Sequence, residues 1–316
     1  MNNMQYQGSN MLSLKKYIDK KRIIFNIIVG TLTIITIYMI SYYIINTTIK
    51  EKNAKQYTAQ IVQYKKQQES QEGREQLEQM KKAKKLKKDT DKRGKLPELT
   101  QKGKENLSNI YHSEQKRAFL TFDDGPSQNT NEILDILKQY DIKATFFVLG
   151  TQAEVMSETV KRIYDEGHYL ANHGYTHIYS SIYQSPEQVL TEYNQCNQII
   201  ANAIQVPEYN SHLFRFPGGF AGGKYAIIKQ QAGKLLEQNG ILNIDWNSLT
   251  GDSEKVNPSA EYLMNNLYNT TQGKNSVVIL MHDALAKRVT VETLPQVIEY
   301  LKNEGYEFEN FYSIIK

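Results

Sequence analysis

Residues 118–126 read AFLTFDDGP, an apolar run that ends in two aspartates, a glycine and a proline. Residues 277–283 repeat this pattern, because VVILM is followed at once by His282 and Asp283. Short apolar runs bounded by turn-forming residues are typical of buried strands. Reactive polar residues directly after such runs predict a functional site at the C-terminal ends of the strands.

Further apolar runs alternate with amphipathic segments along the chain. The runs are KATFFVLG (143–150), HYLANH (168–173), LFRFPGG (213–219) and ILNIDW (241–246). The amphipathic segments are 131–140, 157–167, 185–204, 224–240, 258–269 and 290–305. Ser185-Pro186 is typical of a helix start, and glycines 167, 240 and 305 stand where helices should end. The alternation predicts an α/β fold with parallel strands, either open or closed into a barrel.

The formal net charge of +4 conceals two oppositely charged parts. Residues 1–117 contain 24 Lys and Arg against 11 Asp and Glu, a net charge of +13, whereas residues 118–316 contain 14 against 23, a net charge of −9. The 40% hydrophobic content suffices for a core and excludes wholesale disorder. The single cysteine, Cys196, excludes an intramolecular disulfide framework and any multi-cysteine metal site, and its helical position predicts a small core residue.

Residues 23–45 form an uncharged apolar segment that exceeds the roughly 20 residues needed to cross a bilayer. No small-residue cleavage site follows it, which favours an uncleaved signal anchor over a removed signal peptide. Five basic residues precede the segment at positions 15–22 and three follow it at positions 50–55. This bias predicts a cytoplasmic N-terminus (residues 1–22), a single pass through the cell membrane and an extracellular remainder.

The region after this segment, residues 46–114, is rich in Lys, Gln and Glu and has few apolar positions. Those positions keep no heptad register, so we expect a charged extracellular stalk rather than a coiled coil. The block KKAKKLKK (81–88) either binds anionic wall polymer or lipid headgroups or serves as a solvated spacer, and the spacer is favoured. The folded domain is then expected to cover residues 115–316.

Two histidines and a carboxylate at the expected strand ends suggest a metal site. His173 and His177 are four residues apart, and Asp123-Asp124 ends another strand. Two imidazoles and a carboxylate leave an open coordination position, the pattern of a catalytic zinc or related divalent ion. On one helical turn both imidazoles would reach one ion. The stretch HGYTH lacks the Glu of HExxH, and Gly174 opposes a regular helix, which argues against a zincin.

Five motifs in order resemble those of the NodB-homology polysaccharide deacetylases, carbohydrate esterase family 4. They are TFDDGP (121–126), HGYTH (173–177), RFPGG (215–219), DWNSLTGD (245–252) and ILMHD (279–283). The resemblance covers residues 115–316, and it is strongest with the membrane-anchored peptidoglycan N-acetylglucosamine deacetylases of Gram-positive bacteria. It implies a distorted (β/α) barrel of about seven parallel strands and a metal-dependent hydrolase that removes acetyl groups from a polysaccharide.

The resemblance also implies a role for each residue of these motifs. Asp124, His173 and His177 would hold the metal, zinc in the first place, with Co²⁺ or another divalent ion as alternatives. Asp123 would be the general base, His282 the acid that protonates the leaving amine, and Arg215 the partner that orients Asp123 and keeps it ionised. The oxyanion would be stabilised near Pro217, Gly218 and Gly219, and Trp246 and Leu280 would line the pocket for the acetyl methyl group.

The fourth motif departs from the family pattern, which usually ends in D-x-x-D-W. Sliding the pattern along the sequence places Asp252 as the acid that orients the catalytic histidine, whereas matching on Asp-Trp selects Asp245. We favour Asp252. Four other polar residues are predicted to lie outside the site: Asp283 as a loop acid, His168 as a structural residue, His112 as a solvated residue, and His212 as a surface or core residue.

The substrate is expected to be N-acetylglucosamine in the glycan strands of peptidoglycan, because the wall lies within reach of a stalk-mounted enzyme. The alternatives are poly-N-acetylglucosamine, a chitin-like polymer or acetylated xylan. A non-catalytic wall-binding protein is disfavoured because all motif residues are present. Nothing in the sequence indicates a nucleic-acid ligand or an obligate protein partner.

Overall fold

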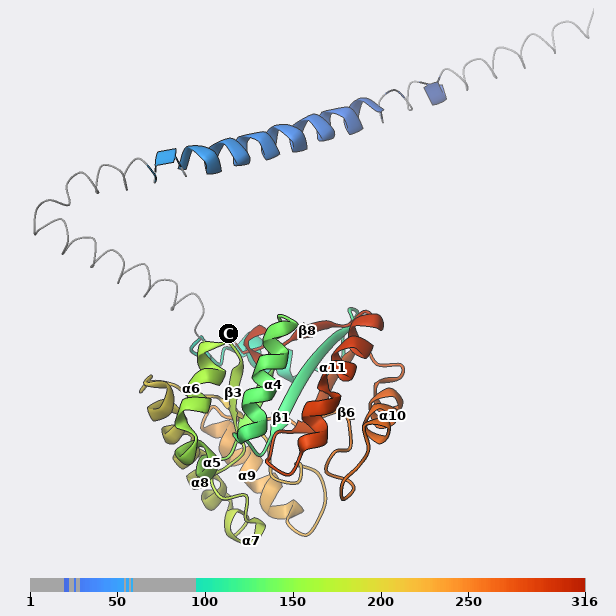
Figure 1. Ribbon diagram of the computed structural model, residues 1–316. Coiled ribbons are helices and arrows are strands. Elements are labelled where there is room, and N and C mark those ends of the chain that lie inside the picture. The colour runs from blue at the N-terminus through green and yellow to red at the C-terminus, as the bar shows by residue number, and fades with distance from the viewer. Residues whose placement is uncertain are drawn as a thin grey trace, which may run out of the picture. The chain divides into compact units, whose positions relative to one another are not determined.

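The computed structural model describes residues 20–22, 26, 29–53, 55–56, 58 and 95–315. The chain divides into two compact units, Met1–Lys85 and Leu86–Lys316. The second unit contains the α/β domain, drawn from green to red in Figure 1. Residues 59–94, which include the basic block 81–88 of the expected stalk, and residues 1–19 lie outside the described residues.

The sheet of this domain contains parallel strands, seven of which follow one path in the order β5-β4-β3-β2-β1-β7-β6. The strands are β1 (Arg117–Asp123), β2 (Thr145–Val148), β3 (Tyr169–Asn172), β4 (Leu213–Phe214), β5 (Leu242–Asn243), β6 (Ser248–Leu249), β7 (Ser276–His282) and β8 (Glu307–Glu309). The sheet curls into a half-barrel whose end strands, β5 and β6, are consecutive in the chain (Figure 1). The predicted distorted barrel of about seven parallel strands is confirmed.

Strands β1 and β7 form the centre of the sheet and pair along their whole length, from Arg117 opposite Ser276 to Asp123 opposite His282. On its other edge, β1 pairs with β8 over its first three residues and with β2 over its last three. The six predicted strands are all present. The strands β6 and β8 were not predicted, because two or three residues are too few to show a periodic pattern.

Helices follow most of the strands and cover the outer face of the sheet (Figure 1). The helices of the domain are α3 (Gln101–Ser108), α4 (Gln128–Gln139), α5 (Gly150–Val155), α6 (Ser157–Asp165), α7 (Tyr179–Ile182), α8 (Pro186–Ile204), α9 (Ala226–Gln238), α10 (Ala260–Thr271) and α11 (Arg288–Asn303), with a 3₁₀ turn at Phe311–Ser313. The Ser185 side chain accepts the N–H of Gln188 and Pro186 is the first helical residue of α8, as predicted.

Alternate residues of the central strands face two different cores. Leu120 and Phe122 of β1 pack with the buried side chains of α4, α6 and α11 on the outer face. Phe119 of β1 and Phe147 of β2 pack inside the half-barrel with Phe311. Thr121 and Asp123 share the parity of Phe119, so their side chains also point inward. The inner core therefore packs directly beneath the C-terminal ends of the strands, where the polar residues lie.

Residues before position 115 also pack against the folded domain. Helix α3 buries Leu107, and Ile110 directly after it is completely buried in the inner core. The carbonyl of Ile110 accepts hydrogen bonds from Arg117 and Ser276, at the start of β1 and β7. Residues 101–110 therefore pack as part of the domain. No apolar periodicity predicts this packing, because α3 is polar apart from Leu107.

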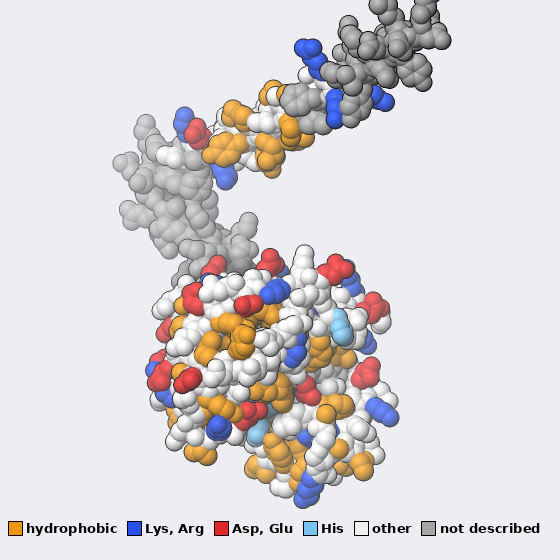
Figure 2. Space-filling view, turned by 90° about the vertical axis from the view of Figure 1, so that its right-hand side faces the viewer, with side chains coloured by type: hydrophobic (Ala, Val, Ile, Leu, Met, Phe, Trp, Pro, Cys, Tyr) orange, Lys and Arg blue, Asp and Glu red, His pale blue; other side chains and the backbone are white. Residues whose placement is uncertain are grey.

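One helix among the described residues, Val29–Asn53, is long and apolar enough to cross a membrane. Its apolar side chains are exposed and cover much of its surface, shown in orange in Figure 2. The hydroxyls of Thr33 and Thr36 donate to carbonyls one turn earlier in the same helix, as expected for polar side chains that must be satisfied locally. The helix overlaps the predicted span 23–45, of which residues 23–25, 27 and 28 lie outside the described residues. It is a candidate membrane anchor.

Candidate active site

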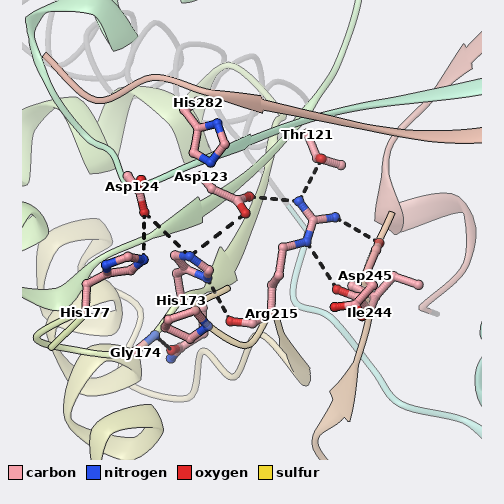
Figure 3. Close-up of polar contacts among 12 residues, drawn as sticks. Thr121, Asp123, Asp124, His173, Gly174, His177, Arg215, Ile244, Asp245 and His282 are labelled. Atoms are coloured by element: carbon pink, nitrogen blue, oxygen red, sulfur yellow. Dashed lines mark hydrogen bonds and ion pairs between the residues drawn. The ribbon is translucent and has the colours of Figure 1, made fainter. Parts of the chain in front are cut away.

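Three side chains from the ends of β1 and β3 converge on one point, as Figure 3 shows for Asp124, His173 and His177. Their ligand atoms all lie within 4.8 Å of one another. Asp124 Oδ1 is 3.5 Å from His173 Nε2 and 3.4 Å from His177 Nε2. Asp124 and His177 both have left-handed backbones, with φ of 73° and 59°. Such conformations are uncommon outside glycine and concentrate at functional sites.

The two histidines reach this point across a turn rather than a helix, in agreement with the expectation that Gly174 opposes a regular helix. Gly174 between them has φ of +87°. Glu192 of α8, almost fully buried, holds the turn. Its Oε2 accepts the backbone N–H groups of Tyr175 and Thr176 at 2.8 Å each, and its Oε1 accepts the Thr176 hydroxyl at 2.7 Å.

The polar atoms at this point fit a bound cation. His173 Nδ1 lies 2.7 Å from the carbonyl of Arg215, which only accepts, so Nδ1 carries the proton. Burial lowers the pKa of His173 to about 3, so the ring is neutral and its Nε2 lone pair faces Asp124. Asp124 Oδ1 is itself buried with no hydrogen-bond partner among the described residues. Acceptors that face each other without a proton are expected where a metal ion lies between them, and this donor set suits zinc and related divalent ions.

Beside this cluster, Asp123 forms a buried ion pair with Arg215, whose Nη1 lies 2.8 Å from Asp123 Oδ1. Arg215 is completely buried, donates to the Thr121 hydroxyl and the Ile244 carbonyl, and stacks 3.9 Å over the Phe147 ring. Burial raises the pKa of Asp123, and the charge of Arg215 opposes the rise without cancelling it. Arg215 therefore holds Asp123 in place and keeps its pKa lower than burial alone would set it, which favours the ionised carboxylate.

On the opposite side of Asp123, the pairing of β1 with β7 sets Asp123 directly beside His282. His282 Nδ1 is 2.8 Å from Asp252 Oδ1. Asp252 Oδ2 accepts both the backbone N–H of His282 and the hydroxyl of Thr290, each at 2.7 Å. Burial lowers the pKa of His282, but the hydrogen bond and charge of Asp252 outweigh it and raise the pKa to about 9. His282 is therefore protonated at neutral pH.

Asp245, the alternative to Asp252, takes a different position. Both of its carboxylate oxygens lie 3.0 Å from the backbone nitrogen of Phe220, at the end of the RFPGG loop. Its carbonyl accepts a hydrogen bond from Arg215. Asp252, and not Asp245, is therefore the carboxylate that contacts His282.

Among the last three residues of the RFPGG loop, 217–219, one backbone donor has no partner in the described part of the chain. Gly219 donates its N–H to the carbonyl of Phe216 at 2.8 Å, and Pro217 has no N–H. Gly218 is exposed, and its N–H donates to no other described residue. Gly218 and Gly219 have φ of 74° and 76°, a backbone that L side chains rarely adopt. The loop thus presents the N–H of Gly218 to an incoming group.

The remaining two predicted residues border this loop and the strand beside it. Trp246 is half-buried and packs against Gly219, where an added Cβ would lie 3.2 Å from the indole ring. Leu280 is opposite Thr121 in the β1–β7 register, so it faces inward two residues below His282. Every predicted site residue thus lies at the C-terminal edge of the half-barrel or directly beneath it.

The sequence of the domain matches the polysaccharide deacetylase family over residues 111–236. A peptidoglycan-N-acetylglucosamine deacetylase of Bacillus cereus is 36% identical over 207 residues, which are 63% of this chain and 70% of that protein. The chain belongs to the polysaccharide deacetylase family. A putative polysaccharide deacetylase of Bacillus subtilis is 36% identical over 198 residues, 61% of this chain and 66% of the relative.

The fold of the deacetylase agrees with this relationship. The solved structure of a Streptococcus mutans CE4 esterase superposes with a TM-score of 0.59, covering 68% of this chain and 97% of that chain at 29% identity. The superposition leaves the remaining part of this chain unmatched. The resemblance inferred from the five motifs is therefore confirmed at the level of the family.

Several buried polar residues of the deacetylase were not singled out from the sequence. Tyr183 donates its hydroxyl to the Pro217 carbonyl at 2.7 Å, and Lys229 donates to the Gly219 carbonyl at 2.6 Å. Together with Asp245 they hold the RFPGG loop. Lys229 lies within the predicted helical segment 224–240 and Tyr183 lies just before the segment 185–204, and neither has a sequence feature that distinguishes it from an ordinary surface residue.

Asp283 lies in the loop after β7, as expected, but its side chain is almost completely buried. Its Oδ2 accepts the hydroxyl of Thr130, and burial raises the pKa of Asp283 to about 7. An added Cβ on Gly125 would lie 2.1 Å from this carboxylate, so Asp283 packs directly under the DDGP turn of the deacetylase.

The histidines outside the motifs have the surroundings expected of structural residues. His168 is buried and its Nδ1 accepts the N–H of Ala144. His212 contacts the carbonyl of Gly240, and His112 is exposed after α3. None of the three lies among the site residues described above. Cys196 is buried in the outer core, as predicted.

Proposed function

We propose that this protein removes N-acetyl groups from N-acetylglucosamine units of peptidoglycan, with a divalent metal held by Asp124, His173 and His177. The observation that carries the proposal is the position of Asp123 and His282, an acid of raised pKa and a histidine of raised pKa, side by side next to the three-ligand cluster. A base and an acid on one site match the two proton transfers of amide hydrolysis.

The metal-site residues suit zinc first, and Co²⁺ or another divalent ion as alternatives. When bound, a divalent cation supplies Lewis-acid chemistry, lowering the pKa of water and polarising an acyl oxygen. The rest of the reaction is derived from the protein's own side chains.

Asp123 takes the proton of the attacking water as the oxygen bonds to the acetyl carbon. Its raised pKa makes it a stronger base than an ordinary aspartate. The 2.8 Å bond from Arg215 fixes one carboxylate oxygen and leaves the other, Oδ2, directed toward His173, from which it is 3.9 Å away. Arg215 is thus a positioning residue that aims the free oxygen of Asp123 at the metal side of the site.

Gly218 stabilises the oxyanion of the tetrahedral intermediate by donating its free backbone N–H. Preorganised donors of this kind contribute about 3 to 4 kcal/mol to lowering a barrier. Elimination selects Gly218, because Pro217 has no N–H and the Gly219 N–H closes a turn. Trp246 and Leu280 line the side of the pocket that receives the acetyl methyl group.

His282 protonates the leaving nitrogen as the carbon–nitrogen bond breaks, which yields acetate and a free amine. This step needs a proton on the imidazole, and the pKa of about 9 maintained by Asp252 keeps it there at neutral pH. Asp252 is the positioning residue for His282, since it holds Nδ1 and leaves the other ring nitrogen free to act.

Peptidoglycan is the proposed substrate, and the cell membrane the proposed location. The Bacillus cereus relative carries peptidoglycan in its name, and the helix Val29–Asn53 provides a candidate anchor. An anchored chain with a cytoplasmic N-terminus and the charged region 46–94 outside would hold the domain near the wall. Other acetylated glycans and a non-catalytic wall-binding role are the alternatives.

The test is acetate release from peptidoglycan, chitooligosaccharide and acetylated xylan, measured in parallel on the full chain with and without a divalent metal. We expect metal-dependent release that is fastest on peptidoglycan. Asp123→Asn should lose activity while retaining bound metal. Equal release by the metal-stripped protein or by Asp123→Asn would exclude the mechanism, and faster release from xylan would reassign the substrate. Binding to wall without any release would support the non-catalytic role.

A further inference from the structure

One exposed aromatic side chain at the site, Tyr179, has no role in the chemistry above. It is the first residue of α7, two residues after His177. Its side chain is 40% exposed. Within the described part of the chain, no hydrogen bond joins its hydroxyl to another residue. Its neighbour Tyr183, in contrast, is buried and bonded to the Pro217 carbonyl, as a structural tyrosine should be.

Tyr179 occupies the space beside the free donor of the RFPGG loop. A Cβ added to Gly218 would lie 2.6 Å from the Tyr179 hydroxyl oxygen and 3.1 Å from Cζ. The Tyr179 ring also packs on His177, with ring centroids 5.5 Å apart. The phenol therefore bridges the metal-site histidine and the glycine whose N–H is free.

The second glycine of the loop is covered in the same way by Trp246. Gly218 and Gly219 thus leave room for two aromatic rings that come from elsewhere in the chain. Of the two rings, Tyr179 is more exposed than Trp246. An acetamide whose oxygen reaches the Gly218 N–H therefore has the Tyr179 phenol as its neighbour on the solvent side.

We propose that Tyr179 binds the sugar unit that carries the acetyl group, with its hydroxyl hydrogen-bonded to a sugar hydroxyl and its ring against the C–H face of the pyranose. The inference deepens the proposed function and rests on it. Aromatic rings with a polar tip suit such a ligand, because a sugar presents both apolar C–H groups and hydroxyls. The ligand class is an N-acetylhexosamine, in preference to a sugar-free acetyl compound.

Tyr179→Phe separates this role from packing, because it retains the ring against His177 and Gly218 and removes the hydroxyl alone. The matched control is Tyr268→Phe in α10, a tyrosine that is 49% exposed and bonded to the amide of Gln272. Two substrates are compared in the full chain: a chitooligosaccharide, and 4-nitrophenyl acetate, which has no sugar. Tyr179→Phe should lower kcat/KM for the oligosaccharide about five- to tenfold, the effect of one neutral hydrogen bond, mainly through KM.

The same variant should leave kcat/KM for 4-nitrophenyl acetate unchanged, and Tyr268→Phe should change neither substrate. Oligosaccharide hydrolysis at the wild-type rate by Tyr179→Phe would overturn the inference. An equal loss on both substrates would also overturn it, since the tyrosine would then act on the chemistry or the metal site rather than on the sugar.

A binding measurement keeps this inference separable from the proposed reaction. The chain has one tryptophan, Trp246, which lies at the site, so its fluorescence reports ligand binding there. In an Asp123→Asn background the oligosaccharide should bind with a Kd raised about five- to tenfold by Tyr179→Phe. An unchanged Kd would refute the role of Tyr179. Wild-type protein that binds the oligosaccharide and releases no acetate from it would refute the proposed reaction instead.

Discussion

Replacing Asp252 by asparagine should move the alkaline limit of activity to lower pH. Asp252 Oδ2 accepts two fixed donors, the backbone N–H of His282 and the hydroxyl of Thr290. The asparagine must turn its remaining oxygen toward the backbone N–H, which cannot rotate. Its NH₂ group then faces His282 Nδ1, where a carboxylate oxygen stood at 2.8 Å. A donor at this place disfavours a proton on Nδ1 and so disfavours the imidazolium.

The magnitude follows from the pKa of His282. It is about 9 with Asp252 in place, and burial alone would lower it from the ordinary value of 6.5. With a pKa of 6.5 as an upper bound for the variant, the protonated fraction at pH 8 falls from about 0.9 to about 0.03. At pH 6 it falls to at most about 0.8. The variant should therefore lose at least about 30-fold at pH 8 from protonation alone, and its loss at pH 6 should be at least about 20 times smaller than its loss at pH 8.

The assay is kcat/KM for acetate release from an N-acetylglucosamine oligomer, measured from about pH 6 to pH 10. Asp245→Asn is the matched control, because Asp245 binds the Phe220 N–H and does not contact His282. The pH at which kcat/KM of Asp245→Asn declines on the alkaline side should stay near that of the wild type, whatever the absolute rate of this variant. A ratio of Asp252→Asn to wild-type activity that is constant across this pH range would refute the reasoning, and so would an alkaline limb that moves with Asp245→Asn.

Four further outcomes follow from the structure. Zinc at about 100 times its Kd should raise the free energy of unfolding of the wild type by about 2.7 kcal/mol and leave that of Asp124→Ala unchanged. If calorimetry shows that zinc stabilises both proteins equally, the metal binds elsewhere. Glu192→Gln should weaken metal binding about 10- to 100-fold with the fold intact, because Glu192 holds the turn between the two histidines; unchanged affinity in a titration contradicts this. Ile110→Ala should cost about 2 to 4 kcal/mol in denaturant unfolding, although it lies in the range expected to be stalk, and a neutral effect would restore the boundary at residue 115. The pKa of His282 is higher in the folded protein than in the unfolded chain, so its contribution to the free energy of unfolding is complete below pH 6.5 and is lost as pH rises through about 9. The loss should reach up to about 3 kcal/mol when unfolding of the wild type is measured across this pH range. Asp252→Asn should not show this loss.

The strand ends in the sequence predict most of the site. A buried parallel strand needs a continuous apolar run, so Asp123, Asp124 and His282 could be placed at one edge from the letters alone. The order of the five motifs also identified the family. The choice between Asp252 and Asp245 stayed open, because both acids lie in an irregular stretch after β5 where no period fixes the direction of a side chain.

The residues that the sequence missed are those whose partners are distant in the chain. Glu192 lies in a helix that has the pattern of any amphipathic helix, and only its three bonds to the HGYTH turn distinguish it. Tyr179 is one of 22 tyrosines, and its contact with Gly218 exists only after β3 and β4 have been brought together. Ile110 is buried because β1, β7 and the C-terminal turn enclose it.

The sequence by itself therefore determined the family, the α/β alternation, the apolar N-terminal segment and the chemical types at the site, because these depend on composition and short-range periodicity. Which carboxylate contacts His282, which residues before position 115 pack on the domain, and the direction in which burial shifts the pKa of Asp123 depend instead on the folded structure. Each of these depends on what surrounds a group in space. Desolvation and hydrogen bonding act over a few ångströms, whatever the distance along the chain.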